Sequence, residues 1–233
     1  MSDALAGLRV LDLSRGLSGA LFSLILADYG AEVIHVESPA GDPLRGHPAF
    51  PLWGRGKKSA VLDLRSDRGR RAARRLAESV DVLVETFRPG VVERLGLAYP
   101  DLAAVHPGLI HTSITGFGRR GPYAHLKGYE GIVMAKLGAM RHVEGMAPRP
   151  GPAFPAVPYA SFSAAHTALH GTLAALYLRE RTGRGQKVET TLVQAIATHD
   201  PWDWFLRIIA ERYPAAFRPA PPYSERLVPT QSF

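Results

Sequence analysis

The feature that most constrains the fold is a regular alternation of short apolar runs with segments whose apolar residues have helical spacing. The first unit consists of an apolar run at residues 8–13, a helically spaced segment at 21–29 that Gly30 ends, and a segment at 32–37 that reads as a second strand. Short apolar runs predict buried strands, and a glycine directly after a helical segment is a common helix end. The first 37 residues therefore predict a strand–helix–strand unit.

The same alternation continues through most of the sequence. We expect further strands at 60–64, 80–85, 109–114 and 187–190, and helices at 67–78, 91–95, 100–105, 131–140, 162–181 and 192–209. Strands that alternate with helices pair in parallel, because each helix carries the chain back across the sheet. The pattern predicts an α/β fold with an open, mainly parallel sheet and helices on both faces.

A loop rich in Gly, Arg and Pro is expected at residues 116–128, directly after one of the predicted strands. Ligands of open α/β sheets bind outside the carboxyl ends of the strands, so this loop is a candidate binding region. We expect residues 1–212 to form one large domain. The proline-rich segment 213–233 contains few core residues and is expected to be a linker.

The composition is that of a globular chain that needs no cross-links. Its 233 residues, 46% of them hydrophobic and 21% charged, can bury a substantial core. The absence of cysteine excludes disulfides, thiolate nucleophiles and zinc–cysteine sites. No secretory leader and no apolar stretch near the roughly 18 residues of a membrane span is present, so we expect no membrane association and a cytoplasmic location.

The formal net charge of +7 favours anionic partners, whether nucleic acid, anionic lipid or a phosphate-bearing cofactor. Six arginines lie in one short segment and are expected to form a solvated helix face: Arg65, Arg68, Arg70, Arg71, Arg74 and Arg75. The sequence lacks a zinc finger and an interleaved aromatic and basic pattern, so we expect no nucleic-acid partner.

Two histidines, His166 and His170, have the four-residue spacing that places side chains on one helix face. No acidic residue nearby would complete a zinc site, so we expect these histidines to pack within the long helix and expect no metal. Trp202, Trp204 and Phe205 are candidates for lining an acyl pocket, with core packing as the alternative.

Motifs along the chain resemble those of the class III CoA-transferases, in the order in which that family carries them. They are Leu8-Arg9-Val10-Leu11-Asp12-Leu13-Ser14, Leu26-Ala27-Asp28-Tyr29-Gly30-Ala31-Glu32-Val33-Ile34-His35-Val36-Glu37, Pro39, Gly41-Asp42-Pro43, Arg45, Arg55-Gly56-Lys57-Lys58-Ser59, Leu62-Asp63-Leu64, Asp81-Val82-Leu83-Val84-Glu85, Arg88-Pro89-Gly90, Gly116-Phe117-Gly118, Gly121-Pro122-Tyr123 and Thr182-Gly183-Arg184-Gly185-Gln186-Lys187-Val188. The resemblance spans roughly residues 5–200 and is specific because so many motifs match in order. It implies a Rossmann-like large domain.

The resemblance also implies a chemistry in which one carboxylate carries the CoA group. A carboxylate attacks an acyl-CoA carbonyl to give a mixed anhydride, CoA thiolate then forms an enzyme thioester, and an acceptor carboxylic acid collects the CoA. The position that matches the family's aspartate is Glu130, after Tyr129. Glu130 is therefore the candidate nucleophile. The alternative is that Glu130 is a surface residue or caps a helix.

Several positions depart from the family pattern. Met134 replaces a glutamine, Ser161 replaces an aspartate at the start of the long helix, and the early Ala-Gly-Pro turn reads Ser18-Gly19-Ala20. In the racemases of the family a His-Asp pair supplies the base, and Tyr129-Glu130 lacks that histidine. CoA transfer is the favoured activity. The alternatives are racemisation or isomerisation of an acyl-CoA, and a non-catalytic CoA-binding or partner subunit or an inactive fragment.

The resemblance implies coenzyme A as the ligand, delivered as an acyl-CoA thioester, with a carboxylic acid as second substrate. Arg45, Lys57 and Lys58 match positions expected to contact its phosphates, followed by Arg88, and solvated surface cations are the alternative. Gly118 and Gly121 are expected to let backbone approach the thioester, or else to be turn glycines. The family adds a second, smaller domain after the linker and forms interlocked dimers, so we expect a homodimer, or a partner chain that supplies the domain missing here.

Overall fold

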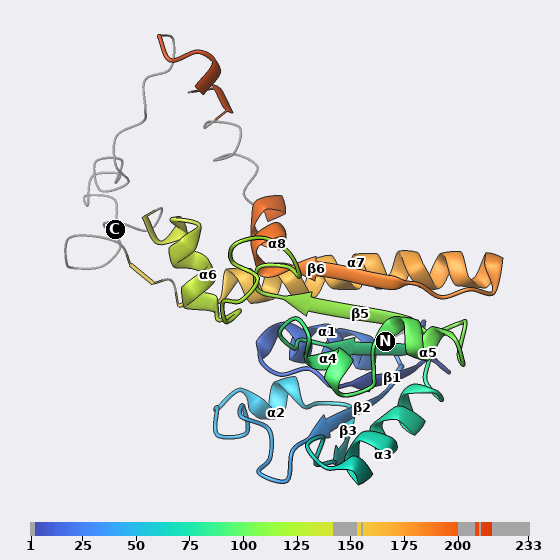
Figure 1. Cartoon of the computed structure of the whole chain (residues 1–233). Helices are drawn as coiled ribbons and strands as arrows, with labels where there is room; N and C mark the ends of the chain where they lie inside the picture. Colours follow the sequence, from blue (N-terminus) through green and yellow to red (C-terminus); the bar gives the residue numbers. More distant parts are fainter. Residues whose placement is uncertain (1–2, 142–152, 155, 200–207, 210, 216–233) are drawn as a thin grey trace.

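The computed structural model describes residues 3–141, 153–154, 156–199, 208–209 and 211–215 (Figure 1). Its centre is a sheet built from β1 (Arg9–Asp12), β2 (Glu32–Glu37), β3 (Lys57–Val61), β4 (Val82–Glu85), β5 (Ile110–Thr115) and β6 (Lys187–Thr191). The strands lie in the order β3-β2-β1-β4-β5-β6, and every neighbouring pair is parallel. The predicted α/β fold with an open parallel sheet is confirmed.

The helices connect these strands and cover both faces of the sheet. They are α1 (Leu17–Asp28), α2 (Phe50–Trp53), α3 (Asp67–Ala77), α4 (Val91–Arg94), α5 (Tyr99–Ala103), α6 (Glu130–Lys136), the 3₁₀ turn η1 (Ala139–Arg141), α7 (Tyr159–Thr182) and α8 (Leu192–His199). Among the described residues no helix is long and apolar enough to cross a membrane.

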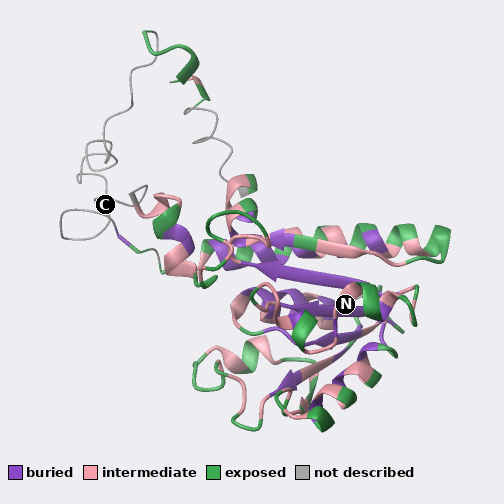
Figure 2. Ribbon diagram, viewed as in Figure 1, coloured by how far each residue is buried: buried purple, intermediate pink, exposed green. Residues whose placement is uncertain are grey.

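Two hydrophobic cores result from the alternation of side chains along the strands. On one face Val10, Val33 and Val84 pack with side chains from α1 and α7, including Phe22 and Ala164. On the other face Leu11, Val36 and Leu83 pack with α3, α4 and α5. The central strands β4 and β5 are buried along their whole length, as Figure 2 shows.

Helix α7 approaches the sheet closely because the side chains on its inner face are small. Ala160, Ala164 and Ala168 are fully buried. Further along, the Thr172 and Thr112 hydroxyls are hydrogen-bonded at 2.7 Å across the helix–sheet contact. A Cβ added to Gly171 would come within 2.7 Å of Val188 Cγ1, so this packing excludes larger residues.

Some predicted boundaries were wrong for local reasons. The strand expected at 60–64 lies at Lys57–Val61, because it is an exposed edge strand whose position is set by pairing with β2 rather than by an apolar run. The helix expected at 131–140 stops at Lys136, and Gly138, with φ 70°, turns the chain into η1. Helix α2 was not predicted. The helix expected at 192–209 is described at Leu192–His199 and again, as helix, at 208–209, and 200–207 lie outside the described residues.

The two histidines expected to pack within the long helix do not do so. His166 and His170 are both exposed on α7, on the side away from its buried alanines. The Nδ1 atom of His166 contacts the Phe162 carbonyl oxygen at 2.8 Å, within the same helix. The four-residue spacing does place the two histidines on one face, and that face meets solvent.

Candidate functional site

A pocket of about 700 Å³ lies where the order of the strands reverses. The chain runs outward from β1 through β2 to β3, then returns to β4 beside β1 and continues outward to β6. Ligands of open α/β sheets bind at such a switch point. The pocket, called the central pocket below, is lined by residues 15–18 after β1, 86–89 after β4 and 114–118 from β5 and the loop that follows, together with residues at the starts of α6 and α7.

Buried carboxylates at the ends of three strands shape the loops around the pockets. Asp12 ends β1, Glu37 ends β2 and Glu85 ends β4, and each is at most 3% exposed. Each accepts a hydrogen bond from a backbone amide further along its own loop: Ser14 at 2.9 Å, Asp42 at 3.0 Å and Phe87 at 2.7 Å. These carboxylates fold the loops back against the strand ends.

Asp12 is the centre of a buried polar cluster. It accepts hydrogen bonds at 2.5 Å from the hydroxyls of Ser14 and Ser23, and its Oδ2 lies 3.1 Å from His35 Nδ1 and 3.7 Å from Lys57 Nζ. Burial by itself raises the pKa of Asp12, but the contacts with His35, Lys57 and Ser14 outweigh burial and hold that pKa at about 2. Asp12 is therefore ionised at neutral pH.

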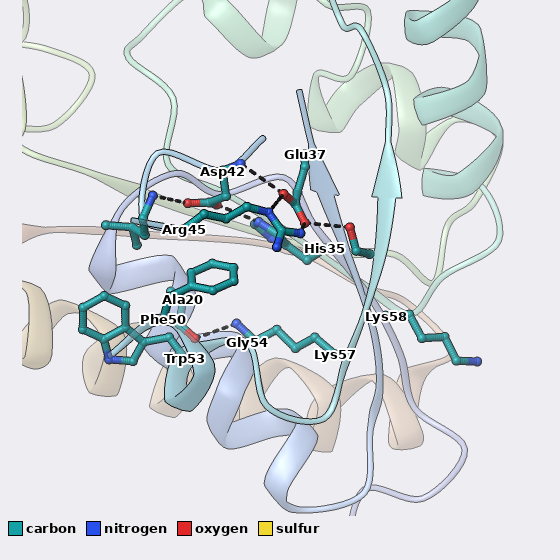
Figure 3. Close-up of a pocket in the computed structure, with 12 residues that line it drawn as sticks. Ala20, His35, Glu37, Asp42, Arg45, Phe50, Trp53, Gly54, Lys57 and Lys58 are labelled. Atoms are coloured by element: carbon teal, nitrogen blue, oxygen red, sulfur yellow. Dashed lines mark hydrogen bonds and ion pairs between the residues drawn. The ribbon is translucent and has the colours of Figure 1, made fainter. Parts of the chain in front are cut away.

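His35 connects this cluster to the loop after β2. Its Nε2 lies 2.8 Å from Asp42 Oδ2 (Figure 3). Because Nδ1 lies 3.1 Å from Asp12, the ring sits between two carboxylates. Burial lowers the pKa of His35, yet the contacts with Asp12 and Asp42 outweigh burial and raise it above its ordinary value. The Nε2 contact has the geometry of a hydrogen bond, whereas Nδ1 is close to Asp12 without that geometry, and the two neighbouring carboxylates favour the charged imidazolium form of His35.

A smaller pocket of about 130 Å³, called the side pocket, lies beside the aromatic rings of Phe50 and Trp53. It is lined by three of the cations expected to contact CoA, namely Arg45, Lys57 and Lys58. Leu44 lines both this pocket and the central pocket, so the two are neighbours.

Each of these three cations already has a carboxylate partner. Arg45 donates to both oxygens of Glu37, at 2.6 and 2.5 Å, and this contact, outweighing burial, holds the pKa of Glu37 at about 2. Lys57 is 5% exposed, lies near Asp12 and donates to the Ala20 carbonyl oxygen at 2.8 Å. Lys58 points away from the pocket and donates to Glu32 at 2.9 Å (Figure 3).

Glu130 lines the central pocket and contacts the start of α7. Its Oε1 accepts the Ala160 amide at 2.7 Å, and its Oε2 accepts the Ser161 amide at 2.9 Å and the Ser161 hydroxyl at 2.7 Å. Pro158, the N-cap residue of α7, offers no side-chain acceptor. Glu130 thus supplies the acceptors that the first amides of this helix lack.

The other predicted site residues divide between the pocket and the surface. Arg88 and Gly118 line the central pocket, whereas Gly121, with φ 98°, lies in the same loop but outside the pocket wall. Gly118 also adopts a positive φ, 87°, as expected of a turn that requires glycine. Trp202, Trp204 and Phe205, proposed for an acyl pocket, lie outside the described residues.

Two cations of the central pocket were not singled out from the sequence. Arg15 follows β1, and Lys127 lies two residues before Tyr129, whose ring it contacts at 5.7 Å. The position of Arg15 directly after a buried strand is a signal that could have identified it. Lys127 has no comparable signal, because its place at the pocket depends on how the loop at 116–128 closes.

The fold is that of an open α/β protein with a pocket at the switch point of its sheet, and comparison with known proteins identifies its family. The sequence model of CoA-transferase family III matches residues 5–221. The succinyl-CoA–D-citramalate CoA-transferase of Chloroflexus aurantiacus is 38% identical over 198 residues, which are 81% of this chain and 49% of that protein. The succinyl-CoA:glutarate CoA-transferase of Mus musculus is 38% identical over 202 residues, 82% of this chain and 46% of that protein.

Solved structures agree with the sequence comparison. The crystal structure of Rv3272 from Mycobacterium tuberculosis aligns with a TM-score of 0.81 and 32% identity, covering 87% of this chain and 57% of that one. A CAIB/BAIF family protein from Brucella suis aligns with a TM-score of 0.80 and 32% identity, covering 91% of this chain and 59% of that one. The chain belongs to CoA-transferase family III. It spans about half the length of the curated relatives that it matches.

Proposed function

We propose that this chain provides the thioester-binding site of a CoA-transferase, which moves CoA from an acyl-CoA to a carboxylic acid. The observation that carries the proposal is the position of Glu130, because it is the one acidic side chain among the described residues that line the central pocket. Family membership supplies the reaction class. A carboxylate in a pocket of about 700 Å³ at the switch point has room for the thioester end of the substrate.

In the proposed reaction the Glu130 carboxylate carries first the acyl group and then the CoA group. In the first step one carboxylate oxygen attacks the thioester carbonyl carbon, the carbon–sulfur bond breaks, and CoA leaves as the thiolate. The thiolate then attacks the Glu130 carboxyl carbon and expels the acyl group as a free carboxylate, which leaves a Glu130–CoA thioester. The acceptor acid reverses these two steps and departs as the new acyl-CoA.

The start of α7 stabilises the charge that develops on Glu130 itself. Attack on the Glu130 carboxyl carbon places negative charge on its oxygen atoms in the tetrahedral intermediate. The amides of Ala160 and Ser161, 2.7 and 2.9 Å from these oxygens, are positioned as donors to that charge. The Ser161 hydroxyl, at 2.7 Å, is a third donor.

A second candidate function is CoA-thioester binding without transfer. It is favoured by the same contacts, because both Glu130 oxygens are occupied by donors of α7 and the carboxylate acts as a cap. Nothing among the described residues of the central pocket favours a racemase, since no histidine lines it. The dimer or partner chain implied by the family resemblance belongs to the proposal and rests on that resemblance. The cytoplasmic location expected from the sequence is also part of the proposal.

The test is mass spectrometry of the intact protein after incubation with succinyl-CoA, for the wild type and for Glu130→Gln. The proposal predicts a CoA thioester on Glu130 in the wild type and no adduct in Glu130→Gln. CoA binding by calorimetry without an adduct in the wild type would favour the second candidate. A wild-type chain that binds neither CoA nor succinyl-CoA would overturn both.

A further inference from the structure

The hydroxyl of Ser161 contacts the one carboxylate of the described pocket lining. Ser161 and Glu130 both line the central pocket, and Ser161 Oγ donates to Glu130 Oε2 at 2.7 Å. An alcohol within hydrogen-bond reach of a base is the arrangement that activates a serine nucleophile. Four other hydroxyl-bearing residues of the lining donate to no carboxylate among the described residues: Ser18, Thr86, Thr115 and Tyr129.

The backbone at the start of α7 fixes the Glu130 carboxylate against this hydroxyl. Its Oε1 accepts the Ala160 amide at 2.7 Å, and its Oε2 accepts the Ser161 amide at 2.9 Å. The base of such a pair needs a third group to orient it, and these two amides provide that group. Ser161 is 8% exposed, so bulk water competes little for its contact with Glu130.

The position of Ser161 in α7 favours negative charge on its oxygen. Ser161 lies in the first turn of this helix of 24 residues, and that turn contains no acidic residue. The positive end of a helix dipole stabilises an anion at this position. It therefore stabilises the charge that develops on Ser161 Oγ as the proton leaves for Glu130.

We infer that Ser161 is a second nucleophile of the central pocket, with Glu130 as its general base, and that the pair hydrolyses an acyl-CoA thioester. This activity is additional to CoA transfer, in which Glu130 itself attacks the thioester. The inference rests on the proposed function only for the identity of the substrate.

The reaction takes place in two steps. Ser161 Oγ attacks the thioester carbonyl carbon while its proton passes to the Glu130 carboxylate. The carbon–sulfur bond breaks, the CoA sulfur takes that proton, and the acyl group remains as an ester on Ser161. Water then attacks the ester carbonyl carbon and gives a proton to Glu130, the bond to Ser161 Oγ breaks, and Oγ regains the proton. The products are CoA and a free carboxylic acid, so no acceptor acid is needed.

Peptide mapping tests the pair after incubation with succinyl-CoA, without an acceptor acid, and an acid quench. Trypsin cleaves after Lys136, so a succinyl ester on Ser161 and a CoA thioester on Glu130 lie in different peptides. A thiol reagent follows the release of CoA, since the chain contains no cysteine. The variant is Ser161→Ala. Its control is Ser163→Ala, which removes a hydroxyl of the same helix that is 6% exposed and lies outside the pocket lining.

We expect a succinyl ester on the Ser161 peptide of the wild type and of Ser163→Ala. Ser161→Ala should lack the ester and release CoA at least about tenfold more slowly than the wild type. Glu130→Gln should also lack the ester, because the amide does not take up the proton of the hydroxyl.

The two adducts separate this inference from the proposed function. A CoA thioester on Glu130 without an ester on Ser161, together with equal CoA release by the wild type and Ser161→Ala, would overturn the inference and leave CoA transfer intact. An ester on Ser161 without the thioester on Glu130 would support the inference and contradict CoA transfer. Neither adduct, with no CoA release above the rate without protein, would overturn both.

Discussion

At the scale of single residues, Glu130 has two separable roles, as a cap of α7 and as a candidate nucleophile. Glu130→Ala removes the acceptor of the Ala160 and Ser161 amides, so we expect the free energy of unfolding to fall by about 1 kcal/mol. Ser161→Ala removes only the hydroxyl donor and is the matched control, with a smaller loss. Urea denaturation measures both. Equal stability of Glu130→Ala and the wild type would show that the cap does not contribute.

His35 gives the protein a stability that depends on pH. Burial and the nearby Lys57 cation lower the pKa of His35, but its contacts with Asp12 and Asp42 outweigh them and raise the folded pKa above 6.5. Its contribution is therefore fully present below about pH 6.5 and is lost as the pH rises through the folded pKa. We expect the difference in unfolding free energy between the wild type and His35→Asn to shrink from about pH 5.5 to about pH 9. A difference independent of pH would contradict the ion-pair assignment.

The sequence predicted which residues line the central pocket better than it predicted the partners of the candidate site residues. Glu130 and Arg88, which the family resemblance singled out, both line the central pocket. The pairing of Arg45 with Glu37 could not be read from the sequence, because it depends on how the loop after β2 folds back over the strand. The same is true of Glu130 and Ser161, which lie 31 positions apart and meet only through packing of α6 against α7.

At the scale of the elements, the buried strands were the most predictable. The strand expected at 32–37 is β2 (Glu32–Glu37), because an apolar run is sufficient to mark a strand covered on both sides. Edge strand β3 contains Lys57, Lys58 and Ser59 and has no such run, so its position was misjudged. The four-residue helix α2 is too short to show a helical period.

The loop at 116–128 closes on itself through two glycines. A Cβ added to Gly128 would lie 2.7 Å from Gly116 Cα, which leaves no room for a side chain. We expect Gly128→Ala to lower the free energy of unfolding by roughly 1–3 kcal/mol and to weaken CoA binding, because Lys127 and Glu130 flank this contact. Calorimetry and thermal unfolding measure the two effects.

Gly131→Ala is the control for that substitution. Gly131 lies in α6, where an added Cβ would meet only Phe154 Cε2 at 3.5 Å, an ordinary contact. Alanine favours a helix over glycine by about 1 kcal/mol, so this variant should be as stable as the wild type or more stable. A Gly128→Ala protein as stable as Gly131→Ala would disprove the tight closure of the loop.

At the scale of the whole molecule, the net charge of +7 and the cationic central pocket both favour an anionic ligand. We expect the affinity for CoA to fall as the salt concentration rises, because exposed charges are screened over about 10 Å at 0.1 M ionic strength. Titrations in low and high salt measure this dependence, with uncharged pantetheine as the control. An affinity for CoA that is independent of salt would argue against Arg15, Arg88 and Lys127 as its partners.

The most direct test of the central claim is calorimetric titration of the wild-type chain with CoA and with dephospho-CoA. The account predicts saturable binding of CoA, because the chain belongs to CoA-transferase family III and its central pocket lies at the switch point, with cations that form no ion pair among the described residues. Weaker binding of dephospho-CoA would show in addition that the 3′-phosphate is recognised. No binding of either compound would contradict the assignment of the central pocket as a CoA-thioester site.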